Sequence, residues 1–328
     1  MGVSKLKQAI SALPAQRGAA DVAKLEESIG DRLNAKESAV LAELLEKEWK
    51  SFSKPGLDAL EKLAGRVAPT AKAAKFEVQK PKTTGVDEIS SVAFVDGALL
   101  AIDDKTAVVW KLNPGGKPIA LREDDGVFDD LEGLCHDAKR SCLLVVTETE
   151  RGLYEIPLSE GGDLKKPKKL GKLPGLAEDA NSGCEGITLL TLPGQKNQVI
   201  GAVNEKDPLA LSFLDRSSLE EKGRVLIPEP MGLLDVSDLC VDPKTGHLFL
   251  LSDESEVVVE AELRKAEKYL GPGPLSSEWS LVEVGRTVLP GLSGDTRLQP
   301  EGITIDEHGD LFVTSEGNQS VMRLKRVG

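Results

Sequence analysis

From about residue 76 to the end of the chain, hydrophobic and polar residues follow the two-residue period of β-strands. The clearest stretch is the last one. An apolar run at residues 303–305 leads into a turn rich in Asp and Gly, and a second apolar run follows at 311–314. This pattern predicts a β-hairpin. Because its two antiparallel strands have matched lengths, Glu301 before the first and Glu316 after the second should lie at the same end.

The sequence pattern of this hairpin occurs in five copies along the chain. Its copies lie at residues 89–92, 131–134, 184–187, 236–239 and 300–303. Each copy continues into a second strand, and most continue into a third. A repeat of roughly 40–60 residues with up to four strands is typical of a β-propeller blade. The sequence therefore predicts a mainly β protein, a β-propeller with five blades. A sixth, degenerate blade within residues 280–292 stays open as an alternative.

The ends of the repeat region suggest how the ring closes. The chain finishes on the third strand of the last blade, so residues 76–79 are expected to supply its outer strand. The long final spacing is expected to contain a helical insert at 261–270.

Residues 1–72 have a different, helical periodicity. Leu41, Leu45 and Trp49 form one apolar stripe on a helix that begins at a capping-box sequence, residues 34–37. The predicted domains are an α-helical bundle at 1–72, either a cap on the propeller or an adaptor that recruits another protein, and the propeller at 73–328.

Charge narrows the classes of partner. The chain of 328 residues has a net charge of −13. Residues 1–80 carry 14 Lys/Arg and 11 Asp/Glu, whereas the remainder carries 27 and 43. The acidity of residues 81–328 argues against nucleic acid as a binding partner and favours cations or a basic protein partner. Such a partner would bind at the acidic face or at the N-terminal helices. No apolar run is long enough to span a membrane and no signal peptide is evident, so a cytoplasmic location is expected.

Acidic residues recur at the start of the first strand in three of the repeats (the entrance position) and after the second strand in all five (the exit position). By the hairpin argument both positions lie on one face, around the central axis. Numerous carboxylate oxygens there favour Ca²⁺, with Mg²⁺ second. The competing interpretation is that these acids cap turns without an ion. The candidate metal ligands are Glu132, Glu148, Glu185, Glu205, Asp253, Glu301 and Glu316, with Asp103 and Asp104 as the exit acids of the first repeat.

Residues 235–255, together with 300–303 and 313–316, resemble the SdiA-regulated family of bacterial β-propellers, and more distantly the phytase-like esterase propellers. The resemblance covers about residues 85–328 and leaves out the N-terminal helices. It implies a propeller fold and calcium at an acidic face, and little about chemistry. The sequence departs from the family pattern at Ser90, which stands where three other repeats carry an entrance Glu.

These observations favour a non-catalytic, calcium-binding propeller that acts as a protein-binding or scaffold module with an N-terminal helical adaptor. The alternative is a metal-dependent phosphoesterase or esterase that uses the same acidic face, with Arg151 and Arg297 to neutralise phosphate. No catalytic residue is assigned and no cofactor other than the ion is expected. No basic cluster accompanies the acids, since the lysine run at 165–169 is expected in a solvated outer loop, and this absence favours the binding module.

Overall fold

The structure of the protein is a computed structural model. It describes residues 23–25, 72–123, 126–128, 130–148, 150–174, 183–206, 208–265, 279–290 and 298–327. Almost all of the predicted N-terminal bundle, Arg297 and the second half of the predicted helical insert lie outside these ranges. Among the described residues, no helix has the length and apolar character that a membrane crossing requires.

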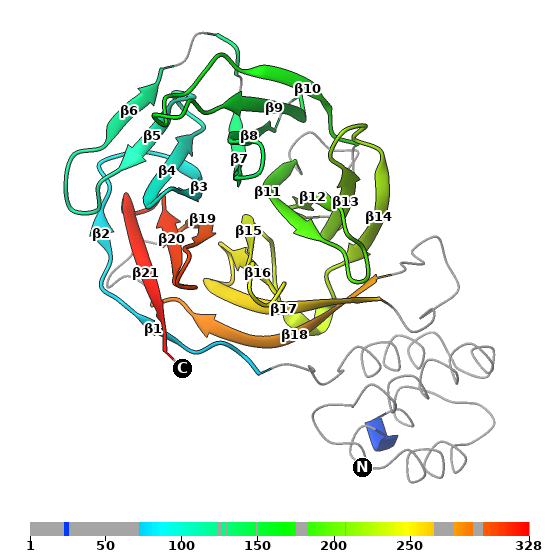
Figure 1. Ribbon diagram of the computed structural model, residues 1–328. Helices are drawn as coiled ribbons and strands as arrows, with labels where there is room; N and C mark the ends of the chain where they lie inside the picture. The colour runs from blue at the N-terminus through cyan, green and yellow to red at the C-terminus, as the bar shows by residue number, and fades with distance from the viewer. Residues whose placement is uncertain are drawn as a thin grey trace.

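Five antiparallel sheets stand in a ring around one axis (Figure 1). From the axis outward, blade 1 contains β3 (Ile89–Val95), β4 (Ala98–Asp103), β5 (Val109–Leu112) and β6 (Ile119–Arg122). Blade 2 contains β7 (Leu131–Asp137), β8 (Cys142–Thr147), β9 (Gly152–Pro157) and β10 (Lys168–Lys172). Blade 3 contains β11 (Cys184–Thr191), β12 (Gln198–Asn204), β13 (Ala210–Asp215) and β14 (Glu221–Leu226).

Blade 4 contains β15 (Asp238–Val241), β16 (Leu248–Ser252), β17 (Val257–Lys265) and β18 (Trp279–Val288). Blade 5 contains β19 (Pro300–Ile305), β20 (Leu311–Ser315), β21 (Ser320–Arg326) and β1 (Phe76–Val78), and β2 (Lys82–Thr83) also pairs with β21. A short 3₁₀ helix, η2 (Glu229–Met231), precedes blade 4. The predicted five-bladed propeller is confirmed.

The hydrophobic core is divided among the spaces between blades. Among the described residues, each pair of neighbouring blades encloses its own cluster of buried apolar side chains. The largest of these clusters lies between blades 3 and 4 and includes Phe213 and Trp279. Their rings meet edge to face with centroids 6.1 Å apart, a favourable arrangement for an aromatic pair. Burial on both faces explains why the second strands, such as β8, are almost entirely apolar.

The ring closes as expected, through the N-terminal strand. β1 pairs antiparallel with β21, with Phe76 opposite Arg326, so the outer strand of the last blade comes from the beginning of the propeller. The chain just before β1 is tied to blade 4 as well. The backbone N–H of Ala74 donates to Glu260 Oε2 at 2.7 Å, and the other oxygen of this buried carboxylate lies 2.6 Å from His247 Nδ1.

Two predictions about blade 4 are wrong. Residues within 280–292 do not form a sixth blade, because β18 is the outer strand of blade 4 and pairs with β17 from Trp279 to Val288. The helical insert also fails where the structure describes it, since residues 261–265 extend β17. Their Glu, Leu, Arg and Lys residues favour helices locally, but pairing with β18 and burial of Ala261 and Leu263 decide the outcome.

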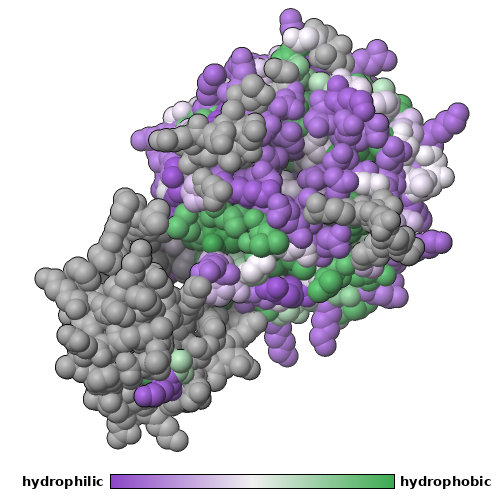
Figure 2. All heavy atoms as spheres, turned by 180° about the vertical axis from the view of Figure 1, so that it is seen from behind, coloured by the Kyte–Doolittle hydropathy of each residue, from purple (hydrophilic) through white to green (hydrophobic). Residues whose placement is uncertain are grey.

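The surface of the propeller is mostly hydrophilic on the side shown in Figure 2, with a smaller area of apolar residues. The predicted lysine loop is partly a strand, because Lys168, Lys169 and Lys172 belong to the outer edge strand β10. Charged side chains on an exposed edge oppose pairing with other chains. The large hydrophobic residues exposed within the described ranges are Ile119, Leu121, Leu234, Val288 and Val327.

Candidate metal centre

A β-bulge starts the innermost strand in four of the five blades. The strand register shifts between Leu131 and Gly133, and likewise at the start of β3, β11 and β19. The residue within each bulge is the predicted entrance residue. These four residues are Ser90, Glu132, Glu185 and Glu301. Bulges redirect side chains at the ends of sheets, which here sends the entrance side chains toward the axis.

A recurring backbone hydrogen bond holds each exit acid beside an entrance position. The N–H of Glu148 donates to the carbonyl of Asp130 at 3.0 Å, and the N–H of Glu316 donates to that of Gln299 at 3.0 Å. Asp104 and Glu205 make the equivalent contacts at 3.4 and 3.5 Å. The acceptor residue is in the left-handed region in three blades, with φ of 50°, 63° and 45° at Glu88, Asp130 and Gln299. Strained backbone that recurs at one repeat position is common at functional sites.

The glycine after each entrance glutamate lets neighbouring innermost strands approach closely. A Cβ at Gly302 would lie 2.9 Å from Ser91 Cα, and one at Gly133 would lie 3.0 Å from the carbonyl oxygen of Glu185. Gly186 meets Asp238 Cα at 2.8 Å in the same way. The Glu-Gly pair therefore places an acid at the axis and brings the next blade against it.

The remaining two blades carry Ser91 and Asp238 at this glycine position, and these two side chains meet across the axis. Ser91 Oγ donates to Asp238 Oδ2 at 2.9 Å, although blades 1 and 4 are not neighbours. The N–H of Ile303 in blade 5 donates to the same oxygen at 2.9 Å. The N–H of Leu134 in blade 2 donates to Ser91 Oγ at 3.1 Å. This cross-axis contact closes the channel directly beneath the entrance residues.

Glu132 and Glu185 lie together at the axis, within hydrogen-bonding contact of each other. Burial and the neighbouring carboxylates, Glu185 foremost, raise the pKa of Glu132 to about 10. Burial and the charge of Glu148 raise the pKa of Glu185 to about 8. Adjacent carboxylates that share a shielded site resist ionising together, which explains both directions.

The other predicted ligands lie around this pair. Burial and the charge of Asp253 raise the pKa of the Glu301 carboxyl well above its usual range, and Glu316 adds to the effect. Burial also raises the pKa of Glu148 and of Glu316. Glu205 is placed differently, because Lys206 Nζ lies 2.7 Å from its Oε1 and 2.8 Å from Glu254 Oε1. The structure thus brings Glu132, Glu148, Glu185, Asp253, Glu301 and Glu316 into one electrostatically coupled group and pairs Glu205 with a lysine at its edge.

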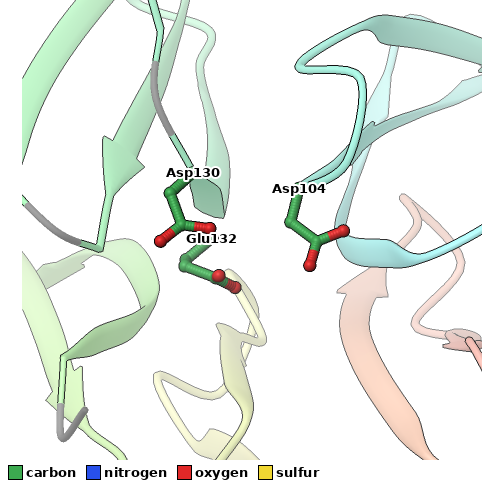
Figure 3. Close-up of side chains that lie close together, drawn as sticks. All are labelled: Asp104, Asp130 and Glu132. Carbon is green, nitrogen blue, oxygen red and sulfur yellow. The ribbon is translucent and has the colours of Figure 1, made fainter.

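The tightest cluster of possible ligands includes a residue that sequence reasoning missed. One carboxylate oxygen from each of Asp104, Asp130 and Glu132 lies within 4.8 Å of the others. Figure 3 shows Asp130 and Glu132 on blade 2 facing Asp104 on blade 1. Asp130 stands two residues before the entrance position, as Glu88 does in blade 1, and that recurrence was a usable signal. Asp103 has a structural role within blade 1 instead, since its carboxylate accepts hydrogen bonds from Thr106 and from Trp110 Nε1.

The donor set fits a hard divalent cation. It consists of oxygen atoms from carboxylates, which are the ligands that Ca²⁺ prefers. Asp104 Oδ1 is buried and has no hydrogen-bond partner among the described residues, so this residue of the cluster has an unsatisfied acceptor. Asp104, Asp130 and Glu132 would hold the ion, and the ion would neutralise carboxylates that otherwise repel one another.

A solved structure shares the fold of this chain, and others align with it less well. Glutaminyl cyclase from Myxococcus xanthus aligns with a TM-score of 0.53 at 13% identity, covering 78% of this chain and all of the cyclase chain. An oxidoreductase (glucose dehydrogenase) from Thermus thermophilus aligns with a TM-score of 0.46 at 12% identity, covering 76% and 99%. A calcium structure of a family AA12 carbohydrate-active enzyme from Trichoderma reesei aligns at 0.43 and 12%, covering 78% and 97%. At these identities the likeness concerns the fold alone.

The sequence profile of the SdiA-regulated family matches residues 68–322, from before the closing strand β1 to the first residues of β21 in blade 5. The resemblance inferred from residues 235–255, 300–303 and 313–316 is confirmed. This chain belongs to the SdiA-regulated family.

Proposed function

We propose that the protein is a non-catalytic binding module whose acidic face holds a divalent cation, Ca²⁺ in preference to Mg²⁺, and receives a cationic partner there. One observation carries this proposal: carboxylates from neighbouring blades converge on a single face, and three of them lie within 4.8 Å of one another. Such a group is self-repelling when it is ionised, and an ion bound there stabilises the folded state by mass action.

The cations on this face support a binding role over hydrolysis. Lys105 contacts Asp87 and Glu88 at 3.3 and 2.8 Å, and Lys206 bridges Glu205 and Glu254. Both lysines are therefore engaged with carboxylates at the edge of the face. A phosphoesterase needs cationic groups free to neutralise a transferring phosphoryl group, in addition to its metal.

Thermal melting of the purified full chain tests the cation. The protein is first treated with EDTA, and Ca²⁺ or Mg²⁺ is then titrated back. We expect a saturable rise in Tm that is larger with Ca²⁺. The rise should be reduced in the Asp104→Asn/Asp130→Asn variant and fully retained in Glu160→Gln, which removes an exposed charge from the opposite face. An equal rise in all three proteins would contradict the assigned face.

Two further measurements on the same samples test the rest of the proposal. A short oligolysine peptide should bind the wild-type chain and bind Glu301→Gln/Glu316→Gln more weakly, with affinity that falls as salt rises. Metal-dependent turnover of phosphate or carboxylic esters that disappears in Asp104→Asn/Asp130→Asn would instead establish the hydrolase alternative.

A further inference from the structure

Blade 1 carries a serine at the position where three other blades carry a glutamate. Ser90 occupies the bulge of β3 in the same register as Glu132 in β7, since Ile89 pairs with Asp103 as Leu131 pairs with Thr147. Two of the glutamates at this position, Glu132 and Glu185, touch each other at the axis. The same backbone geometry directs the Ser90 side chain toward them.

The Ser90 hydroxyl is buried without a partner. The residue is only 8% exposed, and its Oγ makes no hydrogen bond within the described part of the chain. A buried hydroxyl that lacks a hydrogen-bond partner destabilises the folded state. An apolar residue would fill this position at lower cost, so the hydroxyl points to a ligand that completes it.

The surroundings of Ser90 form a site that is closed on its inner side. The contact between Ser91 and Asp238 blocks the axis one residue below. Glu301 is adjacent, because a Cβ on the following Gly302 would lie 2.9 Å from Ser91 Cα. We name Ser90, Glu185 and Glu301 the axial site. Glu132 lies between this site and the Asp104 and Asp130 carboxylates.

Charge also favours more than one ion. Five carboxylates converge here, on Asp104, Asp130, Glu132, Glu185 and Glu301. One divalent cation at the Asp104, Asp130 and Glu132 cluster would leave Glu185 and Glu301 without a cation beside them. A second divalent cation would take the place of the protons that these two carboxyl groups otherwise hold, with Glu132 placed to contact both ions.

We propose that the axial site binds a second divalent cation, Ca²⁺, with Ser90 Oγ as a neutral ligand beside the Glu185 and Glu301 carboxylates. This inference rests on the proposed function, since it concerns the same acidic face. It adds a separate site with its own ligands, and it gives a role to the serine that blade 1 carries where three other blades carry a glutamate.

Calorimetric titration of Ca²⁺ into the EDTA-treated full chain, with parallel melting curves, tests the axial site. The wild type should bind two ions. In Ser90→Ala we expect one binding event to weaken by at least about tenfold, the lower range seen when groups around a metal are removed. The Tm of this variant without Ca²⁺ should equal or exceed that of the wild type, because Ser90 Oγ gives up no internal hydrogen bond.

Ser212→Ala is the matched control, because Ser212 Oγ is also buried without a partner but lies on β13, away from the axis. It should bind both ions as the wild type does. Asp104→Asn/Asp130→Asn should lose the other binding event and keep the one that depends on Ser90.

The outcomes separate the two proposals. If Ser90→Ala binds both ions with wild-type affinity, or if its Tm without Ca²⁺ falls, the axial site is overturned, because Ser90 would then be a bystander or a structural residue. If the wild type binds a single ion that depends on Asp104 and Asp130, the proposed function stands and the axial site fails. If the wild type binds no ion, both fail.

Discussion

At the scale of single residues, the Glu-Gly pair links the candidate chemistry to the packing of the ring. The glutamate occupies a bulge at the axis, and the glycine admits the neighbouring strand. The pair repeats because the same two requirements recur from blade to blade. Where the glycine is replaced, in blades 1 and 4, the new side chains of Ser91 and Asp238 bond to each other.

Gly302→Ala tests this packing. Its Cβ would meet the Ser91 backbone at 2.9 Å and would also clash with Thr314 Oγ1, so β19 and β3 would have to separate. We expect a loss of about 1–3 kcal/mol in the free energy of unfolding, the usual cost of overpacking, measured by denaturant titration.

Gly161→Ala is the control for this substitution, because the nearest atoms to its Cβ are side-chain oxygens at 3.8 Å in an exposed turn. It should change stability by less than about 0.5 kcal/mol. Equal effects at both positions would show that the close approach at Gly302 is not limiting.

Some residues of the candidate site were predictable and others were not. The entrance and exit acids repeat with the strands, so Glu132, Glu301 and Glu316 could be assigned to one face from hairpin geometry alone. Asp130 precedes its strand, and its contribution depends on a left-handed backbone that brings it toward Asp104 of another blade. The Lys206 pairing of Glu205 likewise depends on side-chain positions that no repeat encodes.

At the scale of elements, the segment from residue 72 to 86 acts as a strap along the outside of blade 5. It begins at blade 4, where Phe76 meets Phe249 edge to face at 5.8 Å. It continues through β1 and β2 along β21, and it ends near blade 1, where Gly115 N–H donates to the Thr83 carbonyl at 2.9 Å. Three blades are thereby joined by one short stretch of chain.

Truncation distinguishes the strap from the residues before it. A chain that starts at residue 72 should melt cooperatively, whereas one that starts at residue 80 should lose β1, expose the edge of β21 and aggregate. Circular dichroism and light scattering during heating measure both. Aggregation of the longer chain would show instead that the preceding residues are needed for folding.

A point substitution checks the same contact in the full chain. Phe76→Ala should lower stability by about 2 kcal/mol, because the ring contacts both Phe249 and the Arg326 guanidinium. An unchanged Tm would mean that backbone pairing of β1 alone closes the ring.

Strands that were predicted from the repeated sequence pattern are present in the structure. The helix that was predicted from local propensity alone is not. The closing role of residues 76–79 followed from counting strands in the last repeat. Residues 261–265 are rich in helix formers, and only pairing with the distant Trp279–Val288 strand shows that they are extended. The same strand, β18, accounts for the residues that were considered as a sixth blade. In sequence, a long outer strand and a degenerate repeat look alike.

At the scale of the whole molecule, the acidic face should make stability depend on pH in an unusual direction. The folded-state pKa values of Glu132 and Glu185, about 10 and about 8, are raised above the ordinary value of 4.5. The folded state therefore binds protons more tightly than the unfolded state. This contribution to stability is complete below pH 4.5 and is lost as pH rises through 8 toward 10.

In EDTA, the Tm of the wild type should therefore fall between pH 5 and pH 9 by more than that of Glu132→Gln/Glu185→Gln. We expect the two melting curves to differ by at least about 2 °C at pH 9, which corresponds to about 1 kcal/mol in a domain of this size. Saturating Ca²⁺ should reduce the pH dependence of the wild type. Equal Tm changes in the two proteins would show that these carboxyl groups ionise in the folded protein as they do in the unfolded chain.

The closure of blade 5 has a consequence for synthesis on the ribosome. Phe76 emerges among the first residues of the propeller, and its partner Arg326 emerges among the last. The ring therefore cannot close until β21 has been synthesised, and a message cut short before β19 would yield blades with an open side. Until then β1 has no partner, and this strand must be shielded in the nascent chain.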